Sequence, residues 1–254
     1  MKKSILLTTA LVALGLTPAF AQPGPPAGGA AFDGAMSKLF GDNSAFTATL
    51  ESQIKPQSGD LITMPGKISF DSGKARMEMN LATATGLKLP PGAAAQMKSM
   101  GLDQMVTISL PEKKSVLLIY PGLQSYVDNP LPAAATNLNF KVTTTELGKE
   151  TVAGHPCMEN RVFVTDAKGA TNEFTVWNAT DLKNFPVKIS RTGPEADVTM
   201  LFTDVSLTKP AASLFEPPAG YARYDNVQTM MQTEMMKKMG GGMGLPPGGT
   251  PPAQ

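Results

Sequence analysis

Residues 140–190 read FKVTTTELGKETVAGHPCMENRVFVTDAKGATNEFTVWNATDLKNFPVKIS, and this stretch decides the fold. Apolar and polar side chains alternate along it with the period of two that is typical of half-buried β-strands. Val162 and Val164 fall on one side and their neighbours on the other, before residues 166–169 (DAKG) supply a turn. We therefore expect an antiparallel β-meander here.

Similar alternating runs flank the meander on both sides, and they predict about ten or eleven strands in all. Residues 115–120 are apolar on both sides and are therefore expected to be buried on both faces, with the helix predicted for residues 93–101 as the nearest cover. Residues 121–132 are predicted to be loop-rich, and two consecutive prolines within residues 214–221 are expected to end the sheet. The runs outside the meander are Phe46–Ile54, Ile68–Phe70, Ala75–Leu81, Met105–Leu110, Ser115–Tyr120, Val187–Ser190 and Asp197–Leu207.

Three short helices accompany these strands. The first is predicted to pack on the sheet through Phe32, Met36, Leu39 and Phe40, with Asp33 as its N-cap. The second is expected at residues 93–101, whose last residue is a glycine in the C-cap position. The third is expected at residues 226–239. The fold class is therefore mainly β with short helices.

The first 21 residues have the features of a secretory signal peptide. Lys2 and Lys3 form a basic start, residues 5–16 an apolar run, and Ala19-Phe20-Ala21 a small-x-small cleavage site. The apolar run is shorter than the ~20 residues of a membrane span. Gln22 follows the site, whereas a lipid anchor requires a cysteine there. We expect cleavage before Gln22 and export to the periplasm.

Composition excludes several classes of protein. Residues 22–31 and 240–254 are rich in Pro and Gly and are predicted to be disordered. Without Lys2 and Lys3, 20 basic residues (22 − 2) face 21 acidic ones, and no segment concentrates either sign, so a nucleic-acid-binding surface is not expected. Cys157 is the only cysteine, which excludes an intramolecular disulfide.

The sequence offers no set of catalytic residues. It lacks G-x-S-x-G, H-E-x-x-H, phosphate-loop and dinucleotide-binding motifs. His155, the only histidine, and Cys157 could form a nucleophilic pair, but such a pair also needs oxyanion donors and an orienting group, and the sequence names neither. We interpret His155 as a turn residue, Cys157 as a buried structural residue and the chain as a non-enzyme without metal or cofactor.

The predicted C-terminal helix is rich in methionine. Val227, Met230, Met231, Met235 and Met239 fall within one half of a helical wheel, which suits an adaptable groove or lid. Thioethers are also soft ligands for Cu(I), so copper binding is a second interpretation of this helix. The candidate ligands are Met230, Met231, Met235, Met236 and Met239, with Met243 beyond.

Several short motifs together resemble an uncharacterised family of secreted bacterial proteins, a domain of unknown function. The architecture of that family is similar to the periplasmic lipoprotein carrier LolA. The resemblance covers residues 32–225 and implies a curved antiparallel half-barrel whose concave side is closed by helices over an apolar cavity. The motifs are the signal peptide, Met64-Pro65-Gly66-Lys67, Tyr120-Pro121-Gly122, Glu146–Glu150 with Gly154–Cys157, Phe174–Trp177 and Phe215-x-Pro-Pro-x-Gly-Tyr221.

These observations predict a periplasmic binding protein that holds a hydrophobic or amphiphilic ligand, such as a lipid or the acyl chain of a lipoprotein. Two alternatives stay open: an envelope protein-interaction or sensing module built on the same half-barrel, and a Met-rich copper-binding protein. Each candidate ligand-lining residue is also explained by an ordinary core position. The candidates are Phe70, Met77, Met79, Tyr120, Trp177, Met200 and Phe202.

Overall fold

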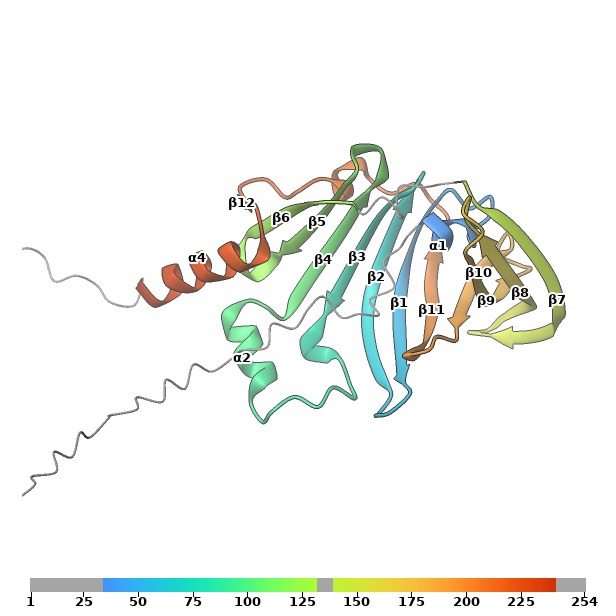
Figure 1. Cartoon of the computed structure of the whole chain (residues 1–254), viewed down its shortest axis with the longest axis horizontal. Helices are drawn as coiled ribbons and strands as arrows, with labels where there is room; N and C mark the ends of the chain where they lie inside the picture. Colours follow the sequence, from blue (N-terminus) through green and yellow to red (C-terminus); the bar gives the residue numbers. More distant parts are fainter. Residues whose placement is uncertain (1–33, 132–138, 241–254) are drawn as a thin grey trace, which may run out of the picture.

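The computed structural model describes residues 34–131 and 139–240, which form one curved twelve-stranded sheet (Figure 1). Its strand order is β12-β6-β5-β4-β3-β2-β1-β11-β10-β9-β8-β7, and every pair is antiparallel except β12 with β6. The predicted fold class is confirmed. The strands are β1 (Ala45–Pro56), β2 (Ile62–Asp71), β3 (Lys74–Asn80), β4 (Gln104–Leu110), β5 (Ser115–Tyr120), β6 (Ser125–Pro130), β7 (Lys141–Val152), β8 (His155–Thr165), β9 (Thr171–Ala179), β10 (Phe185–Arg191), β11 (Ala196–Ser206) and β12 (Ala222–Tyr224).

Helices and single turns connect or flank these strands. The segments predicted at residues 1–21, 22–31 and 240–254 lie outside the described residues, except for Gly240, which ends the last helix. The helices are α1 (Gly34–Lys38), α2 (Ala93–Met100) and α4 (Val227–Gly240), and the 3₁₀ turns are η1 (Leu81–Thr83), η2 (Pro111–Lys113), η3 (Pro121–Leu123) and η4 (Ala212–Phe215). None of the helices in the described ranges has the length and apolar character that a membrane span requires.

The meander predicted from residues 140–190 is formed by β7 to β10. Val162 and Val164 are both buried, as their shared side predicted. The turn after β8 is held by the Asp166 carboxylate, which accepts hydrogen bonds from the backbone N–H groups of Lys168 and Ala170. Local alternation and the turn at residues 166–169 therefore agree with the antiparallel pairing of β8 and β9.

The sheet curves around α1. This helix has only five residues, about 7 Å in length, yet it contacts β8, and Phe40 just after it reaches the ring of Phe70 on β2. β2 and β8 are five strand spacings apart, about 24 Å in a flat sheet. The face that α1 covers is therefore the concave one, and Figure 1 shows the helix lying against it.

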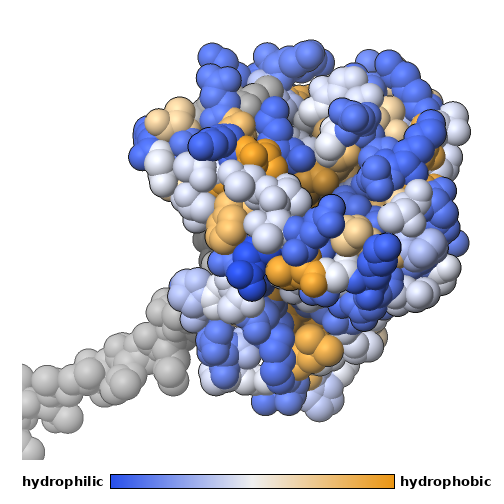
Figure 2. Space-filling view, turned by 90° about the vertical axis from the view of Figure 1, so that its right-hand side faces the viewer, coloured by the Kyte–Doolittle hydropathy of each residue, from blue (hydrophilic) through white to orange (hydrophobic). Residues whose placement is uncertain are grey.

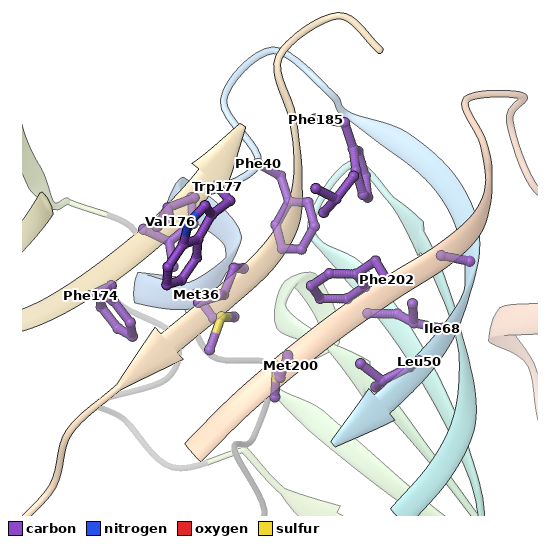
Figure 3. Close-up of a cluster of buried hydrophobic side chains, with 14 of the residues drawn as sticks. Met36, Phe40, Leu50, Ile68, Phe174, Val176, Trp177, Phe185, Met200 and Phe202 are labelled. Atoms are coloured by element: carbon purple, nitrogen blue, oxygen red, sulfur yellow. The ribbon is translucent and has the colours of Figure 1, made fainter. Parts of the chain in front are cut away.

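A cluster of phenylalanine rings fills the concave face beneath α1. The Phe40 ring centroid lies 4.7 Å from that of Phe46, 5.5 Å from that of Phe185 and 5.6 Å from that of Phe202. Figure 3 shows Phe40, Phe185 and Phe202 pointing toward one another among aliphatic and methionine side chains. This half of the concave face is therefore a packed core, and the predicted first helix packs on the sheet through Met36, Leu39 and Phe40. Phe32 and the predicted N-cap Asp33 lie outside the described residues.

The other end of the sheet is covered from its convex side. Residues 207–221 cross β3, β4 and β5, where Phe215 is buried against Ile108, Ile119 and their neighbours. The Arg76 guanidinium donates a hydrogen bond to the carbonyl of Leu214, 3.1 Å away, which ties this segment to β3. The prediction that the 93–101 helix covers β5 is therefore wrong: α2 buries no residue of its own.

Two further predictions about this end are wrong. Residues 121–132 are not all loop, because β6 pairs with β5 over six residues. The prolines at 217 and 218 do not end the sheet, since the chain returns to add β12 alongside β6. Within residues 34–131 and 139–240 the sheet has twelve strands, whereas about ten or eleven were expected.

Candidate ligand-binding site

The concave face is only partly exposed to solvent on β3, β4 and β5. Met79 lies directly opposite Met105, and the row Met77, Thr107, Leu118 crosses the same three strands. This row continues the concave face, because Met77 lies opposite Ile68 of the core. Seven half-buried side chains make up this surface, the inner strip: Met79, Met105, Thr107, Ser109, Val116, Leu118 and Tyr120.

The opposite side of β4 and β5 is fully packed. Val106, Ile108 and Leu110 on β4, together with Leu117 and Ile119 on β5, are buried beneath the 207–221 segment. Residues 115–120 were expected to be buried on both faces, and that expectation is wrong, because Val116, Leu118 and Tyr120 are half-exposed. β4 and β5 are therefore packed on their convex side, whereas their concave side is only half-buried.

The seven predicted ligand-lining residues divide between core and strip. Phe70, Met77, Trp177, Met200 and Phe202 belong to the buried cluster that includes the residues beneath α1. Met79 and Tyr120 lie on the inner strip, and burial raises the pKa of the Tyr120 hydroxyl. Their role as ligand contacts stays a prediction.

Trp177 is held by two polar contacts. Its indole N–H donates to Glu150 Oε2, 2.7 Å away, and the Lys188 ammonium lies 3.9 Å from the ring centroid. Val176 and Ile189, the neighbours of these two residues in sequence, face each other across β9 and β10 in the core cluster. Trp177 is thus fixed between β7 and β10, away from the inner strip.

Sequence reasoning left out Met105, Val116 and Leu118. Their alternation with Val106 and Leu117 was visible, but it predicted two buried faces. Cross-strand pairing could have identified them. Leu118 lies opposite Thr107, and a threonine hydroxyl is unfavourable in an apolar core, which indicates that this face is not fully buried.

Helix α4 lies beside the strip, against β6 and β12 (Figure 1). Met230 is fully buried against Leu123 and Val127, whereas the side chains of Met235 and Met236 are 40% and 73% exposed. Met231 packs partly buried beside Met230, whereas the side chain of Met239 and all of Met243 lie outside what the structure describes. The copper interpretation stays a prediction.

His155 and Cys157 do not form a nucleophilic pair. His155 Nδ1 lies 3.0 Å from Asp181 Oδ2, while the Cys157 thiol donates to the backbone carbonyl of His155, 3.3 Å away. Burial, reinforced by the negative charges of Asp181 and Glu150, raises the pKa of the Cys157 thiol. A buried thiol with a raised pKa is a poor nucleophile, and the expectation of a buried cysteine is confirmed.

Other kinds of site are not evident in the part of the chain that the structure describes. Within residues 34–131 and 139–240, no three or more His, Cys, Asp or Glu side chains gather as metal ligands would. An open pocket of about 520 Å³ lies beside α1, but none of the seven predicted residues contributes to it. Its lining is Lys38, Asn139, Phe140, Lys141, Thr165, Asp166 and Ala167.

Comparisons with known proteins concern the fold. No family model matches the sequence, and no curated protein matches it. Among solved structures, the chain is similar to the lipoprotein LppX of Mycobacterium tuberculosis, with 8% identity over 68% of this chain and 93% of LppX and a TM-score of 0.37. It is also similar to a LolA superfamily protein from Nitrosomonas europaea, with 7% identity over 72% and 94% of the two chains and a TM-score of 0.36.

A third similar structure is MucB in complex with MucA, with 14% identity over 73% of this chain and 59% of MucB and a TM-score of 0.36. TM-scores and identities of this size say nothing about ligand or partner, so the candidate site rests on the geometry of the inner strip.

Proposed function

We propose that this chain is a non-enzymatic binding protein that holds a hydrophobic or amphiphilic ligand, a lipid or the acyl chain of a lipoprotein, on the concave face of its sheet. The observation that carries the proposal is the inner strip, where apolar side chains are half-exposed on β3 to β5 although the other side of β4 and β5 is fully packed. Accessible apolar surface on a concave face is typical of ligand-binding proteins.

The place of action that we propose is the periplasm. The signal-peptide features of residues 1–21 support it. An exported carrier of acyl chains needs an apolar surface that can hold the chain, and it needs no catalytic group. The buried thiol of Cys157 is consistent with a protein that lacks a reactive nucleophile.

The first test is direct. Protein purified without detergent is extracted with organic solvent, and the extract is analysed by mass spectrometry. We expect a bound lipid or fatty acid in stoichiometric amount. The proposal fails if the extract is empty and a dansyl-labelled fatty acid shows no fluorescence change on titration.

A substitution tests whether the ligand binds on the inner strip. Leu118→Asp puts a charge in the middle of the inner strip and is expected to weaken binding of the dansyl fatty acid by at least about tenfold, because a carboxylate is costly to bury beside an acyl chain. The matched control is Leu147→Asp, which places the same charge on an exposed leucine of β7. Equal affinities of the two variants, both folded by circular dichroism, would move the ligand elsewhere.

One observation favours a second candidate function, an envelope protein-interaction module. β7 is a twelve-residue strand at the edge of the sheet, and ten of its side chains are exposed, Val142 and Leu147 among them. Such an edge can accept a strand from another protein. A stoichiometric protein partner from envelope extract, found together with an empty lipid extract, would favour this candidate.

A further inference from the structure

Helix α4 is attached to the sheet by very few buried groups. Val227, Met230, Met231 and Glu234 follow the i, i+3, i+4, i+7 spacing of a contact face. Among its side chains described up to Lys238, however, only Met230 and Glu234 are buried. Val227 and Met231 pack beside Met230 but are only partly buried. A helix with so few fully buried side chains is among the parts of a fold that open at low cost.

The surface beneath Met230 continues the inner strip. Met230 packs on Leu123 and Val127, in a cluster that also includes Tyr120. Val127 lies directly opposite Leu118 of the strip in the β5–β6 pairing. Tyr120 therefore belongs both to the strip and to the covered cluster, so lifting α4 would lengthen one apolar surface.

Polar contacts hold α4 in this position. Glu234 Oε1 accepts hydrogen bonds from the Tyr224 hydroxyl at 2.6 Å, the Lys237 ammonium at 2.9 Å and the Ser125 hydroxyl at 3.1 Å. The Lys238 ammonium donates to the carbonyl of Met100, 2.8 Å away, at the end of α2. Water can replace each of these partners once the helix moves, and opening returns a buried carboxylate to solvent.

We infer that α4 covers a second section of the ligand site and that the distal part of a long acyl chain displaces it. This inference rests on the function proposed above. Met230 occupies the surface that the chain takes over. The hydrogen bonds to Glu234 from Tyr224 on β12 and Ser125 on β6 hold the helix closed in the absence of such a ligand, whereas Lys237 lies on α4 itself and moves with it.

The spacing of the strands predicts that displacement of α4 depends on the length of the acyl chain. The open strip covers β3 to β5, two spacings or about 10 Å, whereas the surface from β3 to β12 covers four spacings, about 19 Å. A short acyl chain is accommodated on the open strip. A long one extends onto β6 and β12, where α4 lies.

The experiment compares dansyl-labelled octanoic acid with dansyl-labelled hexadecanoic acid on the full-length protein. Hydrogen exchange of residues 227–238 reports the docking of α4, and stopped-flow fluorescence gives association rates. We expect both probes to bind and only the long probe to accelerate exchange in α4. Glu234→Ala is expected to raise the association rate of the long probe about fivefold or more, since the open form becomes more populated, and to leave that of the short probe within about twofold.

Two further variants make the outcome unambiguous. Gln232→Ala changes an exposed residue of the same helix and should alter neither rate. Ser125→Ala removes one of the three donors and should shift the long probe in the same direction as Glu234→Ala. Binding of both probes with unchanged exchange in α4, or with no rate effect in Glu234→Ala and Ser125→Ala, overturns this inference alone. Failure of both probes to bind overturns the proposed function as well.

Discussion

At the scale of single residues, Phe40 fixes the shape of the concave face. It comes from the short segment after α1, yet its ring contacts rings from four strands, β1, β2, β10 and β11. Aromatic rings at these separations attract one another beyond the area that they bury. The Phe40 ring therefore covers the concave face from β2 to β10. The inner strip begins on β3, beyond the last of these ring contacts.

Replacing this ring has a large expected cost. Phe40→Ala should lower the free energy of unfolding by about 3–5 kcal/mol, because the ring is 1% exposed and its removal leaves a cavity among four others. Urea denaturation followed by circular dichroism measures the change. Met236→Ala, at a side chain that is 73% exposed, should stay within about 0.5 kcal/mol of the parent. A loss below about 1 kcal/mol in Phe40→Ala would contradict the packing described for this cluster.

The thiol of Cys157 should be inert in the folded protein. It is buried and its pKa is raised, so iodoacetamide at pH 8 is expected to alkylate it at least about 100-fold more slowly than free cysteine. Intact-mass spectrometry over time gives the rate. In denaturant the same thiol should react at the rate of free cysteine, which serves as the internal control. Fast alkylation of the native protein would mean that the β7–β8 hairpin opens.

At the scale of elements, α4 is held weakly enough for a ligand to compete with it. Burial of Met230 stabilises docking by about 1.5–3 kcal/mol, and each buried methylene of a ligand contributes about 0.8 kcal/mol. Two to four methylenes therefore replace what Met230 supplies. By contrast, α1 buries Ala35 and Met36 and leads directly into the buried Leu39 and Phe40, and no ligand of that size displaces it.

The docking of α4 should depend on pH only in acid. Burial acts to raise the pKa of Glu234, but hydrogen bonds from Lys237, Tyr224 and Ser125 outweigh it, so that the pKa is lowered overall. A lowered pKa means that the contribution to stability is present above the pKa of a free glutamate, about 4.3, and is lost as the pH falls through the folded value. The titratable groups that face Glu234 are Lys237 and Tyr224, and the hydrogen bond to Glu234 raises the pKa of the Lys237 ammonium, which therefore stays charged in acid.

Methyl NMR of methionine-labelled protein measures this effect. The Met230 signal, assigned with a Met230→Leu variant, should stay in place from pH 7 to pH 5 and shift toward the position of exposed methionines below about pH 4. In Glu234→Gln the signal should show no such acid transition. A shift centred near pH 6 would point to a different titrating group.

At the scale of the whole molecule, the sheet consists of two consecutive runs of strands joined at one seam. β1 to β6 pair in sequence, β7 to β11 pair in sequence, and the β1–β11 pairing joins the two runs. Figure 2, which looks at the molecule from the β7 side, shows small apolar patches separated by hydrophilic residues at that end. Neither run can bury the α1 cluster alone, because Phe46 comes from the first run, whereas Phe185 and Phe202 come from the second.

The seam predicts how truncation acts. A chain that ends after Arg191 lacks β11 and should show no cooperative unfolding transition, since β1 and β10 each lose a neighbour. A chain that ends after Asp225 keeps all twelve strands and should retain a cooperative transition without α4. Thermal denaturation of both chains tests the pair of expectations. A cooperative transition in the shorter chain would show that the fold does not depend on the β1–β11 pairing.

The sequence predicted the local features of this fold well and its long-range features poorly. Alternation identified β7 to β10 because each strand pairs with its neighbour in the chain through a short turn. β6 was missed because prolines flank it, although Pro121 starts η3 and Pro130 ends the strand, so neither has to donate within the ladder. β12 is too short, at three residues, to show a period.

The candidate site was predictable only in part for a related reason. Alternation shows which side chains share a face, as with Met77 and Met79, but it does not show what covers that face. Met77 is buried, whereas Met79, two residues further from the α1 core, is half-exposed. The difference arises from packing between segments far apart in the chain, and no local pattern carries it.

The seam between β1 and β11 has a consequence during synthesis. From Pro56, where β1 ends, to Ala196, where β11 begins, 140 residues must be made, which takes about 7–28 s at 5–20 residues per second. During that time β1 pairs only with β2, and its other edge, which later pairs with β11, has no partner strand. We therefore expect the unfinished chain to be a chaperone substrate until its last long strand has emerged, and a ribosome-bound fragment that stops before residue 196 should bind such factors more tightly than one that includes residue 206.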